Sequence, residues 1–133
     1  MWYPADAIEE HPDPAGAATR LGRYFAGQLD AVDGIEVELN GTAFQKRVWN
    51  ALLTVRAGRT AAYAEIARAI GAPSAIRAVG AANGANPVAV IVPCHRIIGT
   101  DGRLTGYGGG LDRKRWLLEH EGRLDRGLPE VYL

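Results

Sequence analysis

Residues 60–82 of this chain read TAAYAEIARAIGAPSAIRAVGAA. The first part has apolar residues at helical spacing, with Thr60 as the expected N-cap and Gly71 as the stop. A second helix, over about residues 75–82, is expected to start after Pro73-Ser74. Two short helices joined by such a tight turn predict a helix-turn-helix, and the alternative is an ordinary helical hairpin.

The second of these helices is nearly bare of long polar side chains. Arg77 is the exception, and most of the other positions are small, at Ala75, Ala78, Gly80, Ala81 and Ala82. A recognition helix in the major groove of DNA normally carries several polar side chains that reach base edges. A smooth helix with one arginine better fits a minor groove, where close approach matters. Tight packing against another helix inside the protein is the alternative.

Charge is distributed unevenly along a chain whose formal net charge is zero. Residues 1–40 contain eight acidic and two basic residues, whereas residues 41–133 contain seven acidic and thirteen basic ones. Eleven of those thirteen are arginines, which suit planar contacts with phosphate better than lysines do. The basic part predicts a polyanionic partner, and a merely solvated charged face is the alternative.

The composition is that of an ordinary globular protein of one domain, or of one domain with a short appendage, since 47% of the residues are apolar and 23% are charged. A single cysteine excludes an internal disulfide and fits a reducing cytoplasm. No apolar stretch approaches the roughly 20 residues that span a bilayer. The N-terminus lacks the basic start and apolar core of a signal peptide.

Before the helix-turn-helix, the pattern predicts two helices and a short strand. We expect a helix over about residues 15–29 and a strand over about residues 35–39, where apolar and acidic residues alternate. Thr42 and Gln45 form a capping box that should open the next helix, which closes near Gly58.

After the helix-turn-helix, the β-branched run of residues 88–92 is expected to form a strand. Residues 99–110 are rich in glycine but lack the spacing and the lysine of a phosphate-binding loop. Asp112 is expected to cap a last helix that ends at Gly122. The chain is therefore predicted to be mostly α-helical with short β segments.

The single cysteine lies in the segment Val92-Pro93-Cys94-His95-Arg96. A lone cysteine is usually a small buried apolar residue, but positively charged neighbours favour the thiolate, which is the nucleophilic form. Cys94 and His95 are consecutive, so they cooperate only if the chain turns after Pro93 or if a water bridges them. A histidine base also needs a partner that orients it, and we expect Glu121 near the end of the last helix to do this.

Several ordered motifs resemble the O6-alkylguanine-DNA alkyltransferase family. They run from about residue 41 to residue 122, and they are Gly41-Thr42-Ala43-Phe44-Gln45, Arg77-Ala78-Val79-Gly80, Asn86-Pro87, Pro93-Cys94-His95-Arg96, Gly106-Tyr107-Gly108-Gly109 and Trp116-Leu117-Leu118-Glu119-His120-Glu121-Gly122. The resemblance implies a helix-turn-helix alkyltransferase domain, similar to a winged helix, over residues 41–133. A reduced N-terminal helix and strand segment, residues 1–40, precedes it. Because members usually carry a fuller N-terminal domain, we expect either a reduced N-terminal half or a shortened form.

The resemblance implies DNA repair by direct reversal of damage. Members flip O6-alkylguanine out of the duplex and move the alkyl group irreversibly onto a cysteine, once per molecule. This chain is then a methylated-DNA–protein-cysteine S-methyltransferase with Cys94 as the acceptor. His95 would take the thiol proton through a water, with Glu121 holding the imidazole and Asn86 bracing the site. Tyr63 would donate a proton or hydrogen bond to N3 of the leaving guanine.

The resemblance also assigns contacts to DNA and to the flipped base. Arg77 would fill the gap left by that base, from a helix at residues 75–82 that enters the minor groove. Tyr107 would pack against the alkyl group, the backbone of Gly108 would face O6, and the backbone of Cys94 and Ile97 would hold the guanine edge. Further contacts with DNA or substrate are expected at Ser74, Ala78 and Gly80.

The implied partner is double-stranded DNA containing O6-alkylguanine. The resemblance further implies a protein that is a monomer, lies in the cytoplasm and contacts no membrane. We expect no cofactor and no metal, because the metal ligands in the N-terminal part of some relatives have no counterpart here. One alternative is an alkyltransferase-like protein that binds alkylated DNA without transfer, although such proteins lack the acceptor that Cys94 supplies. Another is a different cysteine enzyme, such as a hydrolase.

Overall fold

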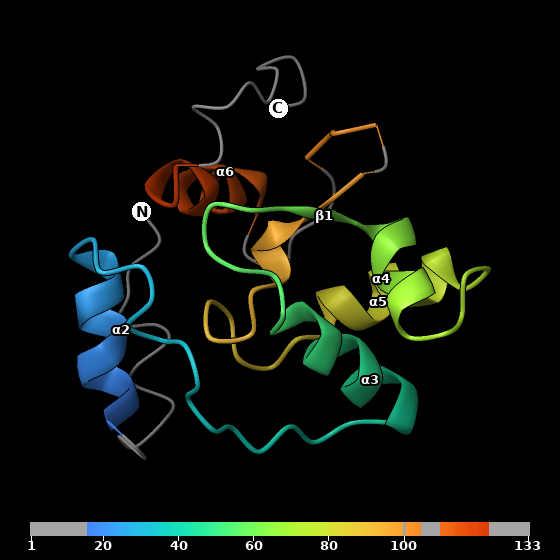
Figure 1. Ribbon diagram of the computed structural model, residues 1–133, viewed down its shortest axis with the longest axis horizontal. Coiled ribbons are helices and arrows are strands. Elements are labelled where there is room, and N and C mark those ends of the chain that lie inside the picture. The colour runs from blue at the N-terminus through green and yellow to red at the C-terminus, as the bar shows by residue number, and fades with distance from the viewer. Residues whose placement is uncertain (1–15, 100, 105–109, 123–133) are drawn as a thin grey trace. The chain divides into compact units, whose positions relative to one another are not determined.

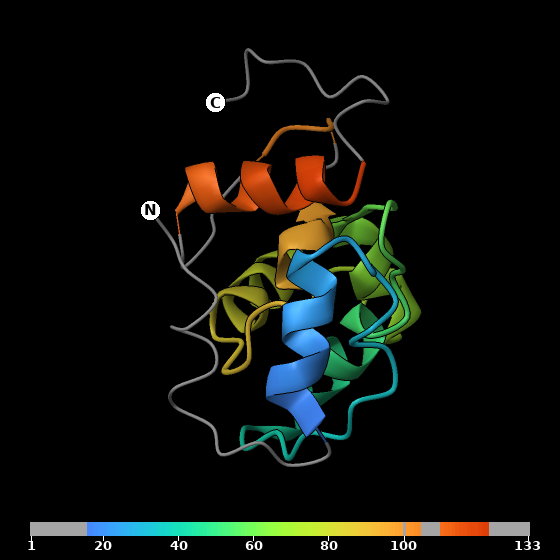
Figure 2. The ribbon, with the colours of Figure 1, turned by 90° about the vertical axis from the view of Figure 1, so that its left-hand side faces the viewer.

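The computed structural model describes residues 16–99, 101–104 and 110–122. The chain divides into two compact units, residues 1–38 and residues 39–133. As the sequence predicts, the described part is mostly helical and contains one short two-stranded sheet (Figure 1 and Figure 2).

The first unit contains helix α2 (Ala17–Phe25), which a partly buried arginine, Arg20, fastens to the chain that follows it. Arg20 donates from Nε to the carbonyl of Ala31 at 2.6 Å and from its terminal nitrogen to the carbonyl of Asp33. These bonds fold the segment after the helix back along it.

Two expectations for the first unit were wrong. The helix predicted over residues 15–29 is shorter, because the chain turns away after Phe25 and reaches a left-handed backbone at Gly27, with a φ of 114°. Residues 35–39 form no strand within the described part of the chain. Ile35 is buried and Glu36 is exposed as the alternation predicts, but no described segment pairs with this stretch.

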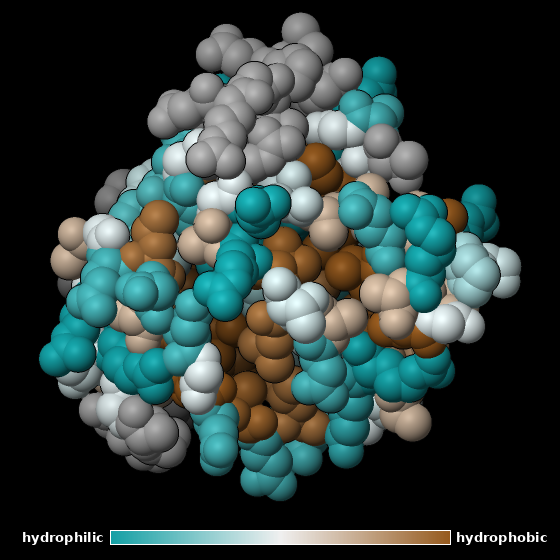
Figure 3. All heavy atoms as spheres, viewed as in Figure 1, coloured by the Kyte–Doolittle hydropathy of each residue, from teal (hydrophilic) through white to brown (hydrophobic). Residues whose placement is uncertain are grey.

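Helix α3 (Ala43–Leu52) opens the second unit with the predicted capping box. The Thr42 hydroxyl accepts from the Gln45 N–H at 3.1 Å, and the Gln45 side chain accepts from the Thr42 N–H at 2.9 Å. Gly41 has to be a glycine here, since a Cβ at that position would lie 2.7 Å from the ring of Trp49. The helix ends at Leu52, earlier than the stop expected near Gly58. Hydrophilic side chains cover the side of the helix that faces away from the rest of the unit (Figure 3).

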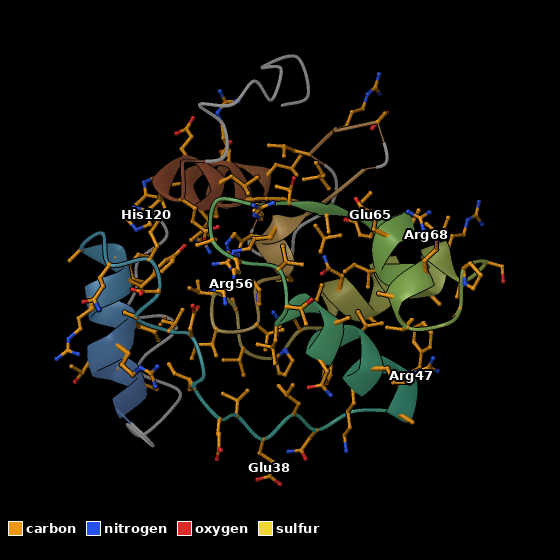
Figure 4. All side chains as sticks on the ribbon, viewed as in Figure 1. Glu38, Arg47, Arg56, Glu65, Arg68 and His120 are labelled. Carbon is orange, nitrogen blue, oxygen red and sulfur yellow. The ribbon has the colours of Figure 1, made fainter. Side chains whose placement is uncertain are left out.

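The predicted helix-turn-helix is present as α4 (Tyr63–Ala69) and α5 (Ile76–Gly84). Both helices pack against α3 and against each other. Gly71, with a φ of 76°, ends the first of them as expected. Arg47 of α3 donates a hydrogen bond to the carbonyl of Ile70, at the turn between the two helices (Figure 4).

Thr60 does not cap α4, contrary to the prediction. Ala61 and Ala62 lie between them and form strand β1 (Ala61–Ala62), which is parallel to strand β2 (Ile97–Ile98). The Glu65 carboxylate, near the N-terminal end of α4 in Figure 4, accepts from the Ala62 N–H at 2.9 Å. One backbone N–H at the start of α4 is therefore satisfied by a side chain from inside the helix.

Residues 88–92 form a compact turn, and the predicted strand there was wrong. Hydrogen bonds within the segment join Val92 N to the Val88 carbonyl at 3.0 Å and Ile91 N to the Ala89 carbonyl at 2.9 Å. Val90 has a φ of 73°, which a β-branched residue rarely adopts and which reverses the chain. Val90, Ile91 and Val92 of this run are buried without being paired in a ladder.

Helix α6 (Leu111–His120) completes the described part of the second unit and packs against the turn that follows Pro93 (Figure 2). Its N-cap is Gly110, so Asp112 lies in the first turn and does not cap the helix as predicted. Leu118 packs with Ile98 and Leu104 in a small apolar cluster. None of the described helices is long and apolar enough to cross a membrane.

Candidate active site

Cys94 lies on a tight turn that brings consecutive side chains to one site. Residues Cys94–Arg96 form the 3₁₀ turn η2, and the N–H of Ile97 closes it by donating to the carbonyl of Cys94. The chain therefore turns directly after Pro93, which is the condition under which Cys94 and His95 can cooperate. Cys94 is 6% exposed and His95 is fully buried.

His95, Arg96 and Glu121 form a buried hydrogen-bonded cluster. His95 Nε2 lies 2.9 Å from Glu121 Oε2, the contact expected from the sequence. Arg96 donates from Nε to Oε1 and from its terminal nitrogen to Oε2, both at 2.8 Å, and it also donates to the carbonyl of Val55 at 2.6 Å. Two elements that are distant in sequence, η2 and the C-terminal end of α6, are joined by this carboxylate.

The electrostatics of the cluster fix the protonation of both partners. Burial alone would raise the pKa of Glu121, but hydrogen bonds from His95 and Arg96 outweigh it and hold that pKa far below its usual range. Burial lowers the pKa of His95, against the opposing effect of Glu121. Because an ionised carboxylate can only accept, the neutral imidazole carries its proton on Nε2 and leaves Nδ1 as an acceptor.

Two asparagines organise the backbone on either side of the thiol. Asn86 donates to the Val92 carbonyl at 2.7 Å and accepts from the Val88 N–H at 2.9 Å, so it closes the turn that leads into Pro93. Asn83, at the end of α5, donates to the Cys94 carbonyl at 3.3 Å. Within the described residues, Asn83 Oδ1 and His95 Nδ1 are the buried side-chain atoms without a hydrogen-bond partner.

A lysine is also buried beside this turn. Lys114 is fully buried in the first turn of α6, and its Nζ donates to the carbonyl of Ile97 at 2.5 Å. Burial lowers the pKa of Lys114 to about 8, although the charge of Cys94 raises it. Within the described residues, no group of three or more His, Cys, Asp or Glu side chains is placed to hold a metal ion.

The model of the 6-O-methylguanine DNA methyltransferase DNA-binding domain matches residues 43–123, which include the whole cluster around Cys94. The chain belongs to this family. The methylated-DNA–protein-cysteine methyltransferase of Mycobacterium tuberculosis (strain ATCC 25618 / H37Rv) is 61% identical in an alignment of 113 residues, and the match covers 83% of this chain and 68% of that protein.

Two crystal structures of DNA complexes are also similar to this member of the methyltransferase family. Mycobacterium tuberculosis OGT in complex with DNA matches with a TM-score of 0.74 and 58% identity, over 82% of this chain and 68% of that one. Schizosaccharomyces pombe Atl1, in complex with damaged DNA containing O6-carboxymethylguanine, matches with a TM-score of 0.55 and 33% identity, over 63% of this chain and 80% of that one.

In this methyltransferase, two of the small side chains of α5, Ala78 and Ala81, face outward. Arg77, Ala78 and Ala81 are exposed, whereas Val79, Ala82 and Asn83 form the buried side of the helix. The small residues of α5 therefore lie on both sides of the helix, with Ala78 and Ala81 open to an outside partner and Ala82 packed inside the protein. Ser74, in the turn before α5, is exposed as well.

Tyr63 starts α4 directly after β1 and lies against α5. A Cβ built at Gly80 would be 3.8 Å from the Tyr63 ring, so the glycine lies in contact distance of that ring. Tyr63 is partly buried, as is Gly80. The two residues that were predicted separately, one for the reaction and one for DNA contact, are thus neighbours.

The structure places most of the predicted site residues on one unit and leaves two outside the described residues. Tyr107 and Gly108 fall in the segment 105–109, which is not described. Arg96, Asn83 and Lys114 were not predicted as site residues. The only sequence signal for Arg96 was its position close to Cys94. No sequence signal pointed to Lys114, because a lysine in a helix is normally solvent-exposed.

Proposed function

We propose that the chain repairs DNA by accepting the alkyl group of O6-alkylguanine on Cys94, irreversibly and once per molecule. The observation that carries the proposal is the nearly buried Cys94 on the same turn as a neutral histidine oriented by Glu121. A thiolate is a soft and strong nucleophile, suited to attack at a saturated alkyl carbon. Family membership adds the DNA-binding domain in which this turn lies.

His95 is the base that we propose for the thiol. Its Nε2 is engaged by Glu121, so Nδ1 is the nitrogen that can take the Cys94 proton, through a bridging water. The lowered pKa of His95, caused by burial, keeps the ring neutral near pH 7 and able to accept that proton. Asn86 braces the turn on which the two residues lie.

In the transfer step, the Cys94 sulfur forms a bond to the alkyl carbon and the bond between that carbon and O6 breaks. The electron pair of the broken bond stays on the guanine, which takes up one proton and leaves as unmodified guanine. Tyr63 supplies a proton or hydrogen bond at N3, which reduces the charge that develops on the leaving group. The backbone of Cys94 and Ile97 holds the guanine edge, while Tyr107 packs against the alkyl group and the Gly108 backbone faces O6.

The target base has to leave the stack before Cys94 can reach it, which costs a few kcal/mol. We propose that α5 enters the minor groove with its exposed small side chains, Ala78 among them, and that Arg77 fills the gap in the stack. Ser74 and Gly80 would contribute to the same contact. All proposed groups come from one chain, so we propose a monomer, which acts in the cytoplasm where the thiol stays reduced.

Intact-protein mass spectrometry after incubation with a duplex that contains one O6-methylguanine tests the proposal. The expected result is a gain of one methylene, roughly 14 Da, mapped to Cys94 and limited to one per molecule. Cys94→Ala should bind the duplex with similar affinity and gain no mass. Wild-type protein that binds the lesion without gaining mass would contradict the proposal and indicate a damage-recognition protein.

A further inference from the structure

Lys114 is a charged residue that the proposed reaction does not yet use. It is fully buried, which is costly for an ammonium group. It also lies in the first turn of α6, where the helix dipole disfavours a positive charge. A lysine kept at a position that is unfavourable on both counts has to be stabilised by groups around it.

One of those groups is the backbone immediately after the cysteine turn. Lys114 Nζ donates to the Ile97 carbonyl at 2.5 Å, and the N–H of the same residue donates to the Cys94 carbonyl. Ile97, whose backbone is proposed to hold the guanine edge, is thus hydrogen-bonded to Lys114 through its carbonyl and to Cys94 through its N–H. Removing the ammonium would free the Ile97 carbonyl to reorient.

A second stabilising group is the charge of Cys94 itself, which raises the pKa of Lys114 against the larger effect of burial. Such coupling is mutual, because a thiolate that stabilises an ammonium is stabilised by it to the same extent. Among the described residues, the other charged or titratable groups of the cluster around this turn are Arg96, Glu121 and His95. Arg96 and Glu121 form an ion pair and neutralise each other. The pKa of His95 is lowered by burial and, to a smaller extent, by Lys114.

We propose that Lys114 is a positioning residue of the alkyl-acceptor site, which holds the Ile97 carbonyl and stabilises the thiolate form of Cys94 by its charge. This proposal rests on the function proposed above for Cys94. Its electrostatic part, however, concerns the free protein and can be measured without DNA.

The pH dependence of Cys94 alkylation by iodoacetamide tests the electrostatic part. For Lys114→Met, the midpoint of the rate profile should rise by about one pH unit, which slows alkylation about tenfold at pH values well below both midpoints. Lys114→Arg should restore most of the wild-type profile, because it keeps the charge. Lys46→Met, which removes an exposed lysine of α3, is the matched control and should leave the profile unchanged. A wild-type midpoint in Lys114→Met would overturn the proposal.

A measurement on the unsubstituted protein covers the case in which the variants do not fold. The chain contains two lysines, Lys46 and Lys114, so ¹³C labelling at lysine Cε gives two NMR signals, one of which is an internal reference. Blocking Cys94 with methyl methanethiosulfonate removes the thiolate charge. The titration midpoint of Lys114 should then fall while that of Lys46 stays, and two unchanged midpoints would overturn the proposal.

These outcomes are separate from those of the DNA assay. If wild-type protein gained no methyl group from O6-methylguanine but Lys114→Met still shifted the iodoacetamide profile, the proposed function would fail and the role of Lys114 toward the thiol would stand. If transfer occurred and neither lysine measurement responded, only the role of Lys114 would fail.

Discussion

Arg96 donates to both carboxylate oxygens of Glu121, each at 2.8 Å, although the two residues are 25 positions apart in the chain. His95, the immediate neighbour of Arg96, donates to the same carboxylate. Two consecutive side chains can converge on one acceptor because the 3₁₀ turn does not send them to opposite faces, as an extended strand would. The orientation of the imidazole therefore depends on a carboxylate that Arg96 holds in place.

Replacing Arg96 by methionine should leave the buried Glu121 carboxylate without its guanidinium partner. We expect the free energy of unfolding to fall by roughly 3–5 kcal/mol, the usual cost of removing one partner of a buried ion pair. Urea denaturation measures this. Arg115→Met breaks a more exposed pair with Glu119 and should cost at most about 0.5 kcal/mol. Similar small losses in the two variants would show that the buried pair is not needed for stability.

His95→Gln should slow alkyl transfer while the lesion is still bound. Loss of a general base usually lowers a rate by about 10²–10⁴-fold. Single-turnover transfer from a duplex with O6-methylguanine gives the rate, and fluorescence anisotropy of the same duplex gives the affinity. His120→Gln changes a histidine of α6 that stacks on Trp116, and it should transfer at the wild-type rate. A His95→Gln rate within threefold of wild type would contradict the proposed base.

Arg77→Ala should affect duplex DNA more than a free base. If Arg77 fills the gap left by the extruded nucleotide, its loss raises the cost of extrusion, which the free base O6-benzylguanine does not require. We expect transfer from duplex DNA to slow by roughly 10-fold or more, with little change for the free base. Arg23→Ala, on α2, is an exposed control and should alter neither rate. Equal losses on both substrates would argue against a role in extrusion.

The protein should lose stability on mild acidification because of His95. Burial lowers the folded-state pKa of His95, so the unfolded chain binds the proton first as the pH falls below about 6.5, and stability decreases. The lowered pKa of Glu121 adds a loss of the same sign below about pH 4.3. Melting temperatures between pH 7.5 and 5 should fall more steeply in the wild type than in His95→Gln. Parallel curves would mean that His95 binds its proton equally in both states.

The features that the sequence predicts correctly are those set by neighbouring residues. The Thr42–Gln45 capping box and the stop at Gly71 need only local geometry, and both are present. The strand predicted over residues 88–92 failed for the opposite reason. Val90, Ile91 and Val92 are apolar because they are buried, and β propensity largely reports burial, so the pattern did not distinguish a buried turn from a strand.

In the site, the contact between His95 and Glu121 was predicted because a base needs an orienting carboxylate and the last helix supplied one. Arg96 and Lys114 were beyond reach of the same reasoning. A charged side chain is assigned to the surface unless its partners are known, and the partners here are backbone carbonyls and a carboxylate brought together by the fold. Burial of charge is a tertiary property that local patterns do not encode.

The two-residue ladder between β1 and β2 has a consequence for how the site can vary. Ala61 pairs with Ile97 and Ala62 with Ile98, so Tyr63 follows one strand directly and Cys94 precedes the other by three residues. The distance between the proposed proton donor and the nucleophile is thus set by main-chain pairing, in steps of about 3.3 Å per residue. Side chains around the site can be exchanged without altering that distance. Inserting a single residue between Ala62 and Tyr63 would instead move the Tyr63 phenol by one residue step relative to Cys94. The distance between these two residues therefore tolerates substitutions far better than insertions or deletions.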